Sequence, residues 1–213
     1  MKIFVAGKPI EDSTEVVRSY ILDHRKTARE FDLHTGTHNE VSDLLIKSTR
    51  IFSSRISEKQ GKELIKRAFT APWDCLDLSD CLADADPTEH GGLYDKGLEL
   101  WNHFTIDWPW PAGIGEAKVS KVLHAMRPSF FPILDSRLRA RYKDRALEMA
   151  REISDSRLFK YAYWAAIRRD LVDSDEALQS VRSKLKMDDH EMVRTWAKHV
   201  SDVRLHDVLA WSN

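Results

Sequence analysis

Hydrophobic residues recur three and four positions apart along most of the chain, which is the spacing of one face of an α-helix. In residues 13–31, for example, a Ser or Thr can cap the first turn, and one stripe of the helix contains Val16, Val17, Tyr20 and Ile21. Only residues 2–6, "KIFVA", have the character of a short strand or an extended arm. The pattern therefore predicts an all-α protein with about ten helices and at most one N-terminal strand.

Start signals sharpen the prediction for two helices. Ser57 and Gln60 have the spacing of a capping box, which predicts a helix that follows Ser57. Proline is favoured at the first position of a helix, where its missing N–H group is not needed. Pro72 therefore predicts a further helix over 72–83. Near the C-terminus, residues 196–211 predict two short helices with Trp196 and Trp211 in the core.

The length of 213 residues suits one compact unit, 1–213, with two lobes. The apolar run near the N-terminus is too short for the hydrophobic region of a signal peptide. No apolar run approaches the roughly 18 residues that a membrane span needs. We therefore expect a cytoplasmic monomer that does not associate with membranes. Cys75 and Cys81 are the only cysteines, so a metal site or an iron–sulfur cluster built from four cysteines is excluded.

The net charge of −1 hides two oppositely charged segments. Residues 70–107 contain nine acidic residues and one lysine, whereas residues 118–151 contain nine basic and three acidic residues. A basic segment in a neutral protein is typical of a local phosphate-binding face, because a polyanion responds to the nearby patch. The alternative is a solvated helix face that pairs with the acidic segment.

The segment 112–139, "AGIGEAKVSKVLHAMRPSFFPILDSRLR", carries the most specific pattern. Gly113 and Gly115 permit a tight turn and a close approach of a ligand, and Ile114 between them fits a core position. The next helix would leave its first N–H groups open to an anion, with Lys118 and Lys121 on a shared polar face. The segment is a candidate phosphate-binding hairpin, although many such turns are ordinary helix connections.

An aspartate ends the extended run "FFPILD" directly before a basic helix that carries Arg137 and Arg139. Asp135 is well suited to cap this helix, and that is the simplest interpretation of the residue taken alone. It could also be a catalytic carboxylate at a fixed distance from the hairpin. The two roles are compatible, because the N–H groups of a helix start hold a carboxylate in place.

Gly-Ile-Gly, a helix, and "FPILD" with the aspartate twenty positions after the second glycine together resemble the helix-hairpin-helix DNA glycosylases of base excision repair. The "FPILD" is most similar to that of the adenine-DNA glycosylases. The resemblance covers about residues 111–142. More loosely, "HNEVSDLL" and "VRLHDVLAW" resemble an uncharacterised bacterial family that shares this core.

The resemblance implies a two-lobed helical fold with a helix-hairpin-helix core at about 92–150, between N-terminal helices at 13–83 and C-terminal helices at 155–211. It implies double-stranded DNA as the partner, phosphate contacts from the hairpin, and a monovalent cation at the hairpin carbonyls as the one candidate cofactor. Asp135 would stabilise the sugar cation or activate water during cleavage of the N-glycosidic bond. A flipped base needs a stacking pocket, for which we select three tryptophans that precede the hairpin: Trp101, Trp108 and Trp110.

One departure from the family's pattern limits the activity that the resemblance implies. Strand-cutting members of the family carry a lysine two positions after the second glycine, where this chain has Ala117. We therefore expect a monofunctional glycosylase without lyase activity. The alternatives are a non-catalytic helix-hairpin-helix DNA-binding protein and a helical protein–protein adaptor. His34 and His38 suggest surface loop histidines rather than a metal site, because no third ligand accompanies them.

Overall fold

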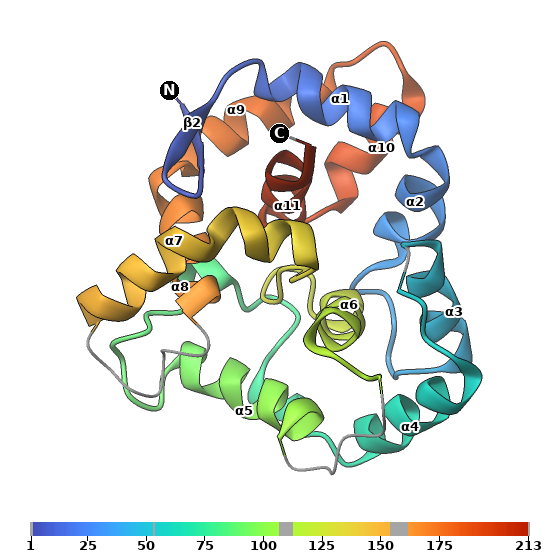
Figure 1. The fold of residues 1–213 in the computed structure, drawn as a ribbon. Coiled ribbons are helices and arrows are strands. Elements are labelled where there is room, and N and C mark those ends of the chain that lie inside the picture. The colour runs from blue at the N-terminus through green and yellow to red at the C-terminus, as the bar shows by residue number, and fades with distance from the viewer. Residues whose placement is uncertain (1, 53, 107–112, 154–161, 213) are drawn as a thin grey trace.

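The two ends of the chain pack together in the computed structural model, which describes residues 2–52, 54–106, 113–153 and 162–212. The described helices and strands are, in chain order, β1 (Ile3–Val5), β2 (Lys8–Ile10), α1 (Ser13–Asp23), α2 (Arg25–Glu30), η1 (Asp32–His34), α3 (Asp43–Ile51), α4 (Glu58–Phe69), η2 (Trp73–Cys75), η3 (Leu82–Asp84), α5 (Leu93–Thr105), α6 (Glu116–Met126), α7 (Ser136–Ile153), α8 (Ala162–Asp173), α9 (Asp175–Lys186), α10 (Glu191–His199) and α11 (Asp202–Ser212). Helix α1 packs against α9, α10 and α11, as Figure 1 shows.

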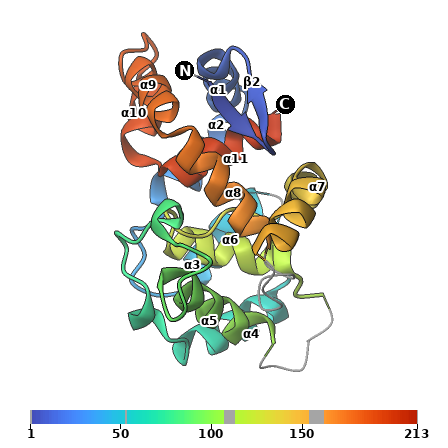
Figure 2. The same ribbon diagram turned by 90° about the vertical axis from the view of Figure 1, so that its left-hand side faces the viewer.

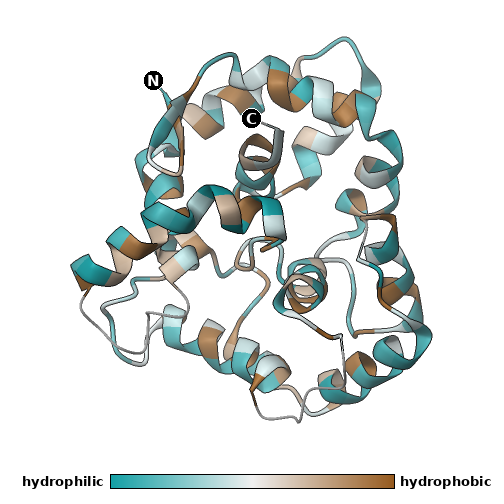
Figure 3. Cartoon of the chain, in the orientation of Figure 1, coloured by the Kyte–Doolittle hydropathy of each residue, from teal (hydrophilic) through white to brown (hydrophobic). Residues whose placement is uncertain are grey.

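A second group of helices is built from the middle of the chain. Helix α6 packs against α3 and α5, and α4 also packs against α3 and α5. Figure 2 shows this group below the N- and C-terminal helices, with the packed pair α7 and α8 between the two groups. Figure 3 shows hydrophobic residues concentrated on the sides of the helices that face their neighbours. The predicted all-α class is confirmed for the described residues.

The N-terminal strand belongs to a small antiparallel hairpin, in which Ile3 pairs with Ile10. Gly7 in its turn has a φ of +72° and donates its N–H group to the Asp170 carboxylate on α8 at 3.2 Å. The same carboxylate accepts a bond of 2.7 Å from the Tyr142 hydroxyl on α7. The hairpin is therefore attached to the pair of helices that leads away from Asp135.

The structure differs from the sequence prediction at residues 72–83, where two short 3-10 turns replace the predicted α-helix. Arg127, directly after α6, donates to the backbone oxygens of Leu76 at 2.8 Å and Trp73 at 3.3 Å. These contacts attach the irregular segment to the end of α6. A further difference is a break at His24 that divides the predicted helix 13–31 into α1 and α2.

The capping box is confirmed, since the Ser57 hydroxyl accepts from the backbone N–H of Gln60 and the Gln60 side chain accepts from that of Ser57. The two predicted C-terminal helices correspond to α10 and α11. None of the helices in the described ranges combines the length and the apolar character that crossing a lipid bilayer requires.

Candidate active site

The glycine hairpin leads directly into α6, as the sequence predicts. Gly113 has a φ of +93°, Ile114 is buried, and Gly115 occupies the N-cap position without any side-chain hydrogen bond to the helix. Lys118 folds back onto the turn, and its Nζ donates to the Gly113 carbonyl at 2.6 Å and to Gln60 Oε1 at 2.8 Å. One of the carbonyls at which the resemblance implies a cation therefore already binds an ammonium group.

Asp135 caps the basic helix α7. Its Oδ1 accepts from the backbone N–H groups of Arg137 at 3.0 Å and Leu138 at 2.9 Å, which are the contacts of an N-cap residue. The capping interpretation is therefore confirmed. Oδ2 makes no hydrogen bond within the described residues, and the side chain is half-buried. One carboxylate oxygen is thus fixed by the helix while the other is available to a ligand.

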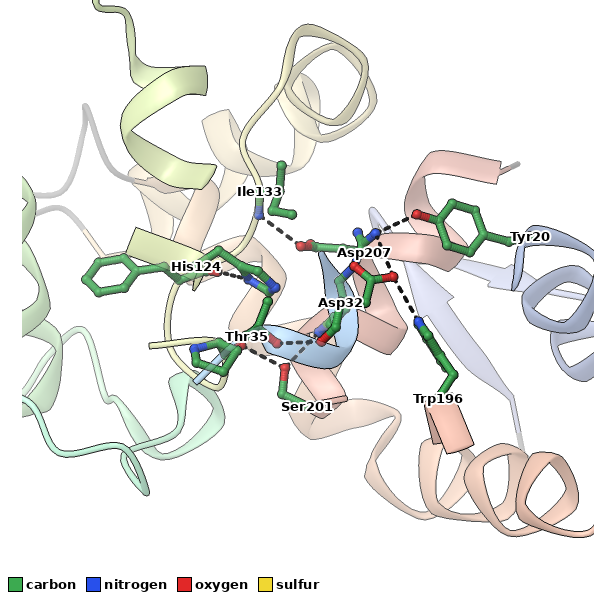
Figure 4. A network of polar contacts seen from close by, with 11 residues as sticks. Tyr20, Asp32, Thr35, His124, Ile133, Trp196, Ser201 and Asp207 are labelled. Carbon is green, nitrogen blue, oxygen red and sulfur yellow. Dashed lines mark hydrogen bonds and ion pairs between the residues drawn. The ribbon is translucent and has the colours of Figure 1, made fainter. Parts of the chain in front are cut away.

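The extended segment before Asp135 is held from two sides. The backbone N–H of Ile133 donates to Asp207 Oδ2 on α11 at 2.9 Å, and that of Leu134 donates to Ser120 Oγ on α6 at 3.1 Å. Figure 4 shows the contact between Asp207 and Ile133. Because both partners lie in packed helices, the approach of the chain to Asp135 is fixed by the tertiary structure.

A cavity of about 210 Å³ lies beside Asp135, and we call it the Asp135 cavity. It is formed where both groups of helices meet, and its lining residues are Tyr20, His24, Thr27, Ile51, Phe52, Lys121, Asp135 and Trp211. The His24 ring stands edge-on to Trp211, with 5.3 Å between the ring centroids. A groove of about 390 Å³ shares Tyr20, His24 and Trp211 with the cavity. A larger cavity of about 610 Å³ beside Phe69 shares no lining residue with the Asp135 cavity or with the hairpin.

Lys121 lies in this cavity and not on the surface beside Lys118. Its side chain is buried, its Nζ donates to the Phe52 carbonyl at 2.7 Å, and the same atom lies 5.0 Å from the centre of the Phe52 ring. The expectation of a shared polar face is wrong because α3 covers the Lys121 side of α6. Burial lowers the pKa of Lys121, an effect that the negative charge of Asp135 opposes.

A buried ion pair supports the wall of the cavity. Arg204 Nε on α11 lies 2.9 Å from Asp32 Oδ1, and Arg204 also donates to the Tyr20 hydroxyl at 2.6 Å. Trp196 Nε1 donates to Asp32 Oδ2 at 2.8 Å, as Figure 4 shows. Such a pair contributes little net stability when complete, but it is costly to break because a lone buried charge remains. The network fixes the position of Tyr20.

Two groups near Asp135 have strongly shifted pKa values. Burial raises the pKa of Asp207 to about 7, and the charges of Asp135 and Asp32 act in the same direction, while Arg204 opposes them. Burial and the charge of Arg204 lower the pKa of His124 to about 3. His124 Nδ1 bonds the Phe131 carbonyl at 2.7 Å, so the histidine also positions the segment that leads to Asp135.

Arg139 brings the start of α7 to the start of α6, since it forms an ion pair of 2.8 Å with Glu116. Arg137 is exposed, and its guanidinium lies 4.6 Å from the centre of the Trp211 ring. Three tryptophans were selected for a base pocket, and the assignment of Trp101 to it is wrong. Trp101 is buried against Trp164, with ring centroids 5.4 Å apart, and it does not line the Asp135 cavity. Trp108 and Trp110 lie outside the described residues.

His34 and His38 line a separate cavity of about 430 Å³. Burial lowers the pKa of His38, and the nearby charge of His34 acts in the same direction. Across the described ranges, no group of three or more histidine, cysteine, aspartate or glutamate side chains is arranged to hold a metal ion.

Sequence reasoning misses most of the cavity wall. Helical spacing assigns Tyr20 and Trp211 to the core, and His24 and Phe52 carry no motif at all. Lys121 lies next to the apolar stripe of α6, and this position is a signal that its side chain could be buried. The stripe alone does not indicate which neighbouring helix covers the lysine. The wall joins residues almost two hundred positions apart, which no local pattern can indicate.

Residues 68–213 match the model of one protein family. This span contains the hairpin together with Lys121, Asp135 and Trp211, whereas Tyr20 and Phe52 precede it. No curated protein matches the chain, and no solved structure matches it. Since the family match covers more than half of the chain, the protein belongs to DUF6308, a family of unknown function.

Proposed function

We propose that the protein is a DNA glycosylase that binds double-stranded DNA, accepts a flipped base in the Asp135 cavity, and cleaves its N-glycosidic bond. The observation that carries the proposal is the position of Asp135. Its Oδ1 is fixed by two N–H groups of α7, while the residue lines a cavity with aromatic walls. The twenty-residue spacing from Gly115 and the resemblance of "FPILD" to the glycosylases add support.

The chemistry suits a carboxylate held in this way. Cleavage of the bond builds positive charge on the sugar, and a fixed carboxylate next to C1′ stabilises that charge without having to reorganise. The cavity volume of about 210 Å³ is several times the ~30 Å³ share of one water molecule, so the cavity has room for a ring system. Tyr20, His24 and Trp211 supply ring surfaces against which a base could pack.

The ion pair between Arg139 and Glu116 supports a shared DNA-binding face, because it brings the start of α7 next to the start of α6. Gly113, Ile114 and Gly115 would contact the phosphates through their backbone, and exposed Arg137 would add a basic side chain. We retain Lys118 on this face, where its ammonium group also orders the hairpin. We do not retain Lys121, which is buried.

The test is release of a free base from duplexes that contain uracil, hypoxanthine, alkylated purines, mispaired adenine or modified phage bases, measured by mass spectrometry. Asp135→Asn should abolish release and leave duplex binding intact. Asp175→Asn, which changes an exposed acid in the first turn of α9, is the matched control and should retain full activity.

Release that survives Asp135→Asn would overturn the assigned role of this residue. Salt-dependent duplex binding without release of any base would favour the non-catalytic DNA-binding alternative. Absence of duplex binding even at low salt would overturn both and leave the adaptor hypothesis.

A further inference from the structure

Three aromatic side chains line both the Asp135 cavity and the groove of about 390 Å³ beside it, which we call the Trp211 groove. Tyr20, His24 and Trp211 pack against one another where α1 meets α11, with ring centroids 4.9, 5.3 and 6.1 Å apart. Figure 1 shows these two helices side by side. A substituent on a base in the Asp135 cavity therefore has only these rings to pass before it enters the groove.

The rest of the Trp211 groove is far more acidic than the Asp135 cavity, since Asp12, Glu15 and Asp23 line it. Asp12 is the N-cap residue of α1, but its φ of 48° is left-handed and its side chain makes no capping hydrogen bond. The Asp23 carboxylate likewise has no hydrogen bond or ion pair to the described residues. Glu15 accepts a bond of 3.1 Å from the Ser19 hydroxyl. Two carboxylates on the groove are thus available to a ligand.

The aromatic wall of the groove already binds a cation. The guanidinium of Arg137 lies 4.6 Å from the centre of the Trp211 ring, because the face of an indole attracts positive charge. Arg137 is exposed, and under the proposed function it contacts a DNA phosphate, which leaves the Trp211 ring to another cation. Aromatic rings beside unpaired carboxylates are the arrangement that recognises an alkylammonium group, whose charge both attract.

We propose that the Trp211 groove binds an alkylammonium group on the flipped base, so that the substrate is a modified base with an amine-bearing substituent. This inference rests on the proposed function and names its substrate class. The ring of the base lies in the Asp135 cavity, and its substituent runs past Trp211 toward Asp12 and Asp23. A neutral substituent of similar length fits the groove in the same way but lacks the attraction of the carboxylates.

The experiment measures duplex binding by the full chain with Asp135→Asn, which keeps the helix cap and prevents release of the base. Two labelled duplexes differ at one position, which holds either C5-aminoallyl uracil or its N-acetylated, uncharged analogue. An added ammonium lowers the negative charge of the duplex, so general electrostatic attraction to the protein can only fall. The duplex with the amine should nevertheless bind at least roughly fivefold more tightly in fluorescence anisotropy, because of the groove.

Adding Asp12→Asn and Asp23→Asn to this protein should reduce the preference for the amine to less than about twofold. Asparagine tolerates the left-handed backbone of Asp12, so the fold should be retained, and circular dichroism verifies this. Asp175→Asn, which neutralises an exposed acid on α9, is the matched control and should keep the full preference.

Equal affinity for the two duplexes, or a preference that survives the loss of both carboxylates, would overturn the inference. Base release by the unmodified protein separates this result from the proposed function. Release of a base without any preference for the amine would overturn the groove assignment alone. A preference that depends on Asp12 and Asp23, without release of any base, would support the groove and overturn the glycosylase proposal alone.

Discussion

Asp207 accepts a hydrogen bond of 2.9 Å from the backbone N–H of Ile133, across seventy-four positions of sequence. The bond joins α11, near the end of the chain, to the extended segment that delivers Asp135 to its cavity. Asp207 is fully buried, and its other oxygen has no hydrogen-bond partner in the described structure. The position of the candidate catalytic carboxylate therefore depends on a second carboxyl group that does not reach the cavity.

Asp207→Asn should flatten the pH dependence of stability between pH 5 and pH 8. Burial raises the pKa of Asp207 from 3.8 to about 7, so the folded state binds this proton more tightly than the unfolded state. Stability from this group is present at low pH and is lost as the pH rises toward 7. Relative to the variant, the unmodified protein should lose roughly 2.5 kcal/mol over this range, because each pH unit at which the folded state keeps the proton and the unfolded state has lost it corresponds to about 1.4 kcal/mol.

Urea unfolding at both pH values measures this difference. Asparagine can still accept from Ile133, so a variant that loses base release as well as the pH slope would show that the carboxyl group has a further role. Equal slopes in the two proteins would contradict the raised pKa.

Arg204→Met should destabilise the protein by roughly 3–5 kcal/mol, because Asp32 would keep a buried charge without its partner. Arg169→Met removes an exposed i,i+4 pair with Asp173 and is the control, with an expected cost of about 0.5 kcal/mol or less. Thermal or urea denaturation measures both. Comparable losses in the two variants would contradict the assigned importance of the buried pair.

Two substitutions at Asp135 separate capping from catalysis. Asparagine is as good an N-cap residue as aspartate, so Asp135→Asn should leave the unfolding free energy nearly unchanged while base release is lost. Asp135→Ala should lose about 1 kcal/mol of stability as well, because the N–H groups of Arg137 and Leu138 lose their acceptor. Parallel denaturation and base-release measurements test this pair, and full activity in either variant would count against a catalytic role.

Gly115→Ser should stabilise the protein and weaken its binding to DNA. Gly115 has an ordinary extended φ of −97°, nothing lies within 4 Å of where a Cβ would stand, and serine is a better N-cap than glycine. Stability therefore does not require glycine at this position. A close approach of a phosphate to the backbone would require it.

Fluorescence anisotropy with a labelled duplex measures the binding of Gly115→Ser to DNA, and thermal denaturation measures its stability. Gly97→Ala is the contrasting variant and should be destabilising, because the added Cβ would overlap the Phe130 ring. A Gly115→Ser variant that binds DNA as tightly as the unmodified protein would remove the hairpin from the proposed interface.

Lys118→Ala should weaken duplex binding and reduce the slope of log K against log salt by about 1, as loss of one phosphate contact does. Lys121→Arg should leave this slope unchanged, because Lys121 is buried and is not expected to contact phosphate. Titrations at several salt concentrations compare the two variants. A slope that depends on Lys121 and not on Lys118 would reverse the assignment of the two lysines.

The features that could be predicted from the sequence are those that depend on neighbouring residues. The helical class, the capping box of Ser57 and Gln60, the glycine turn before α6 and the capping role of Asp135 follow from interactions within a few positions. Such interactions are set by local backbone geometry and by the spacing of side chains along one helix. For the same reason the sequence did not predict the conformation of residues 72–83, where Arg127, more than fifty positions away, binds two backbone carbonyl groups.

The set of side chains that surround Asp135 depends on how distant helices pack, and no local pattern predicts it. Tyr20, Phe52, Lys121 and Trp211 line one cavity because α1, α3, α6 and α11 pack together, and that packing buries apolar faces that look alike in the sequence. The burial of Lys121 shows the difference most clearly. Its spacing on α6 allowed a surface lysine beside Lys118, but the neighbouring helix α3 removed it from solvent and placed its amine in the cavity beside Asp135.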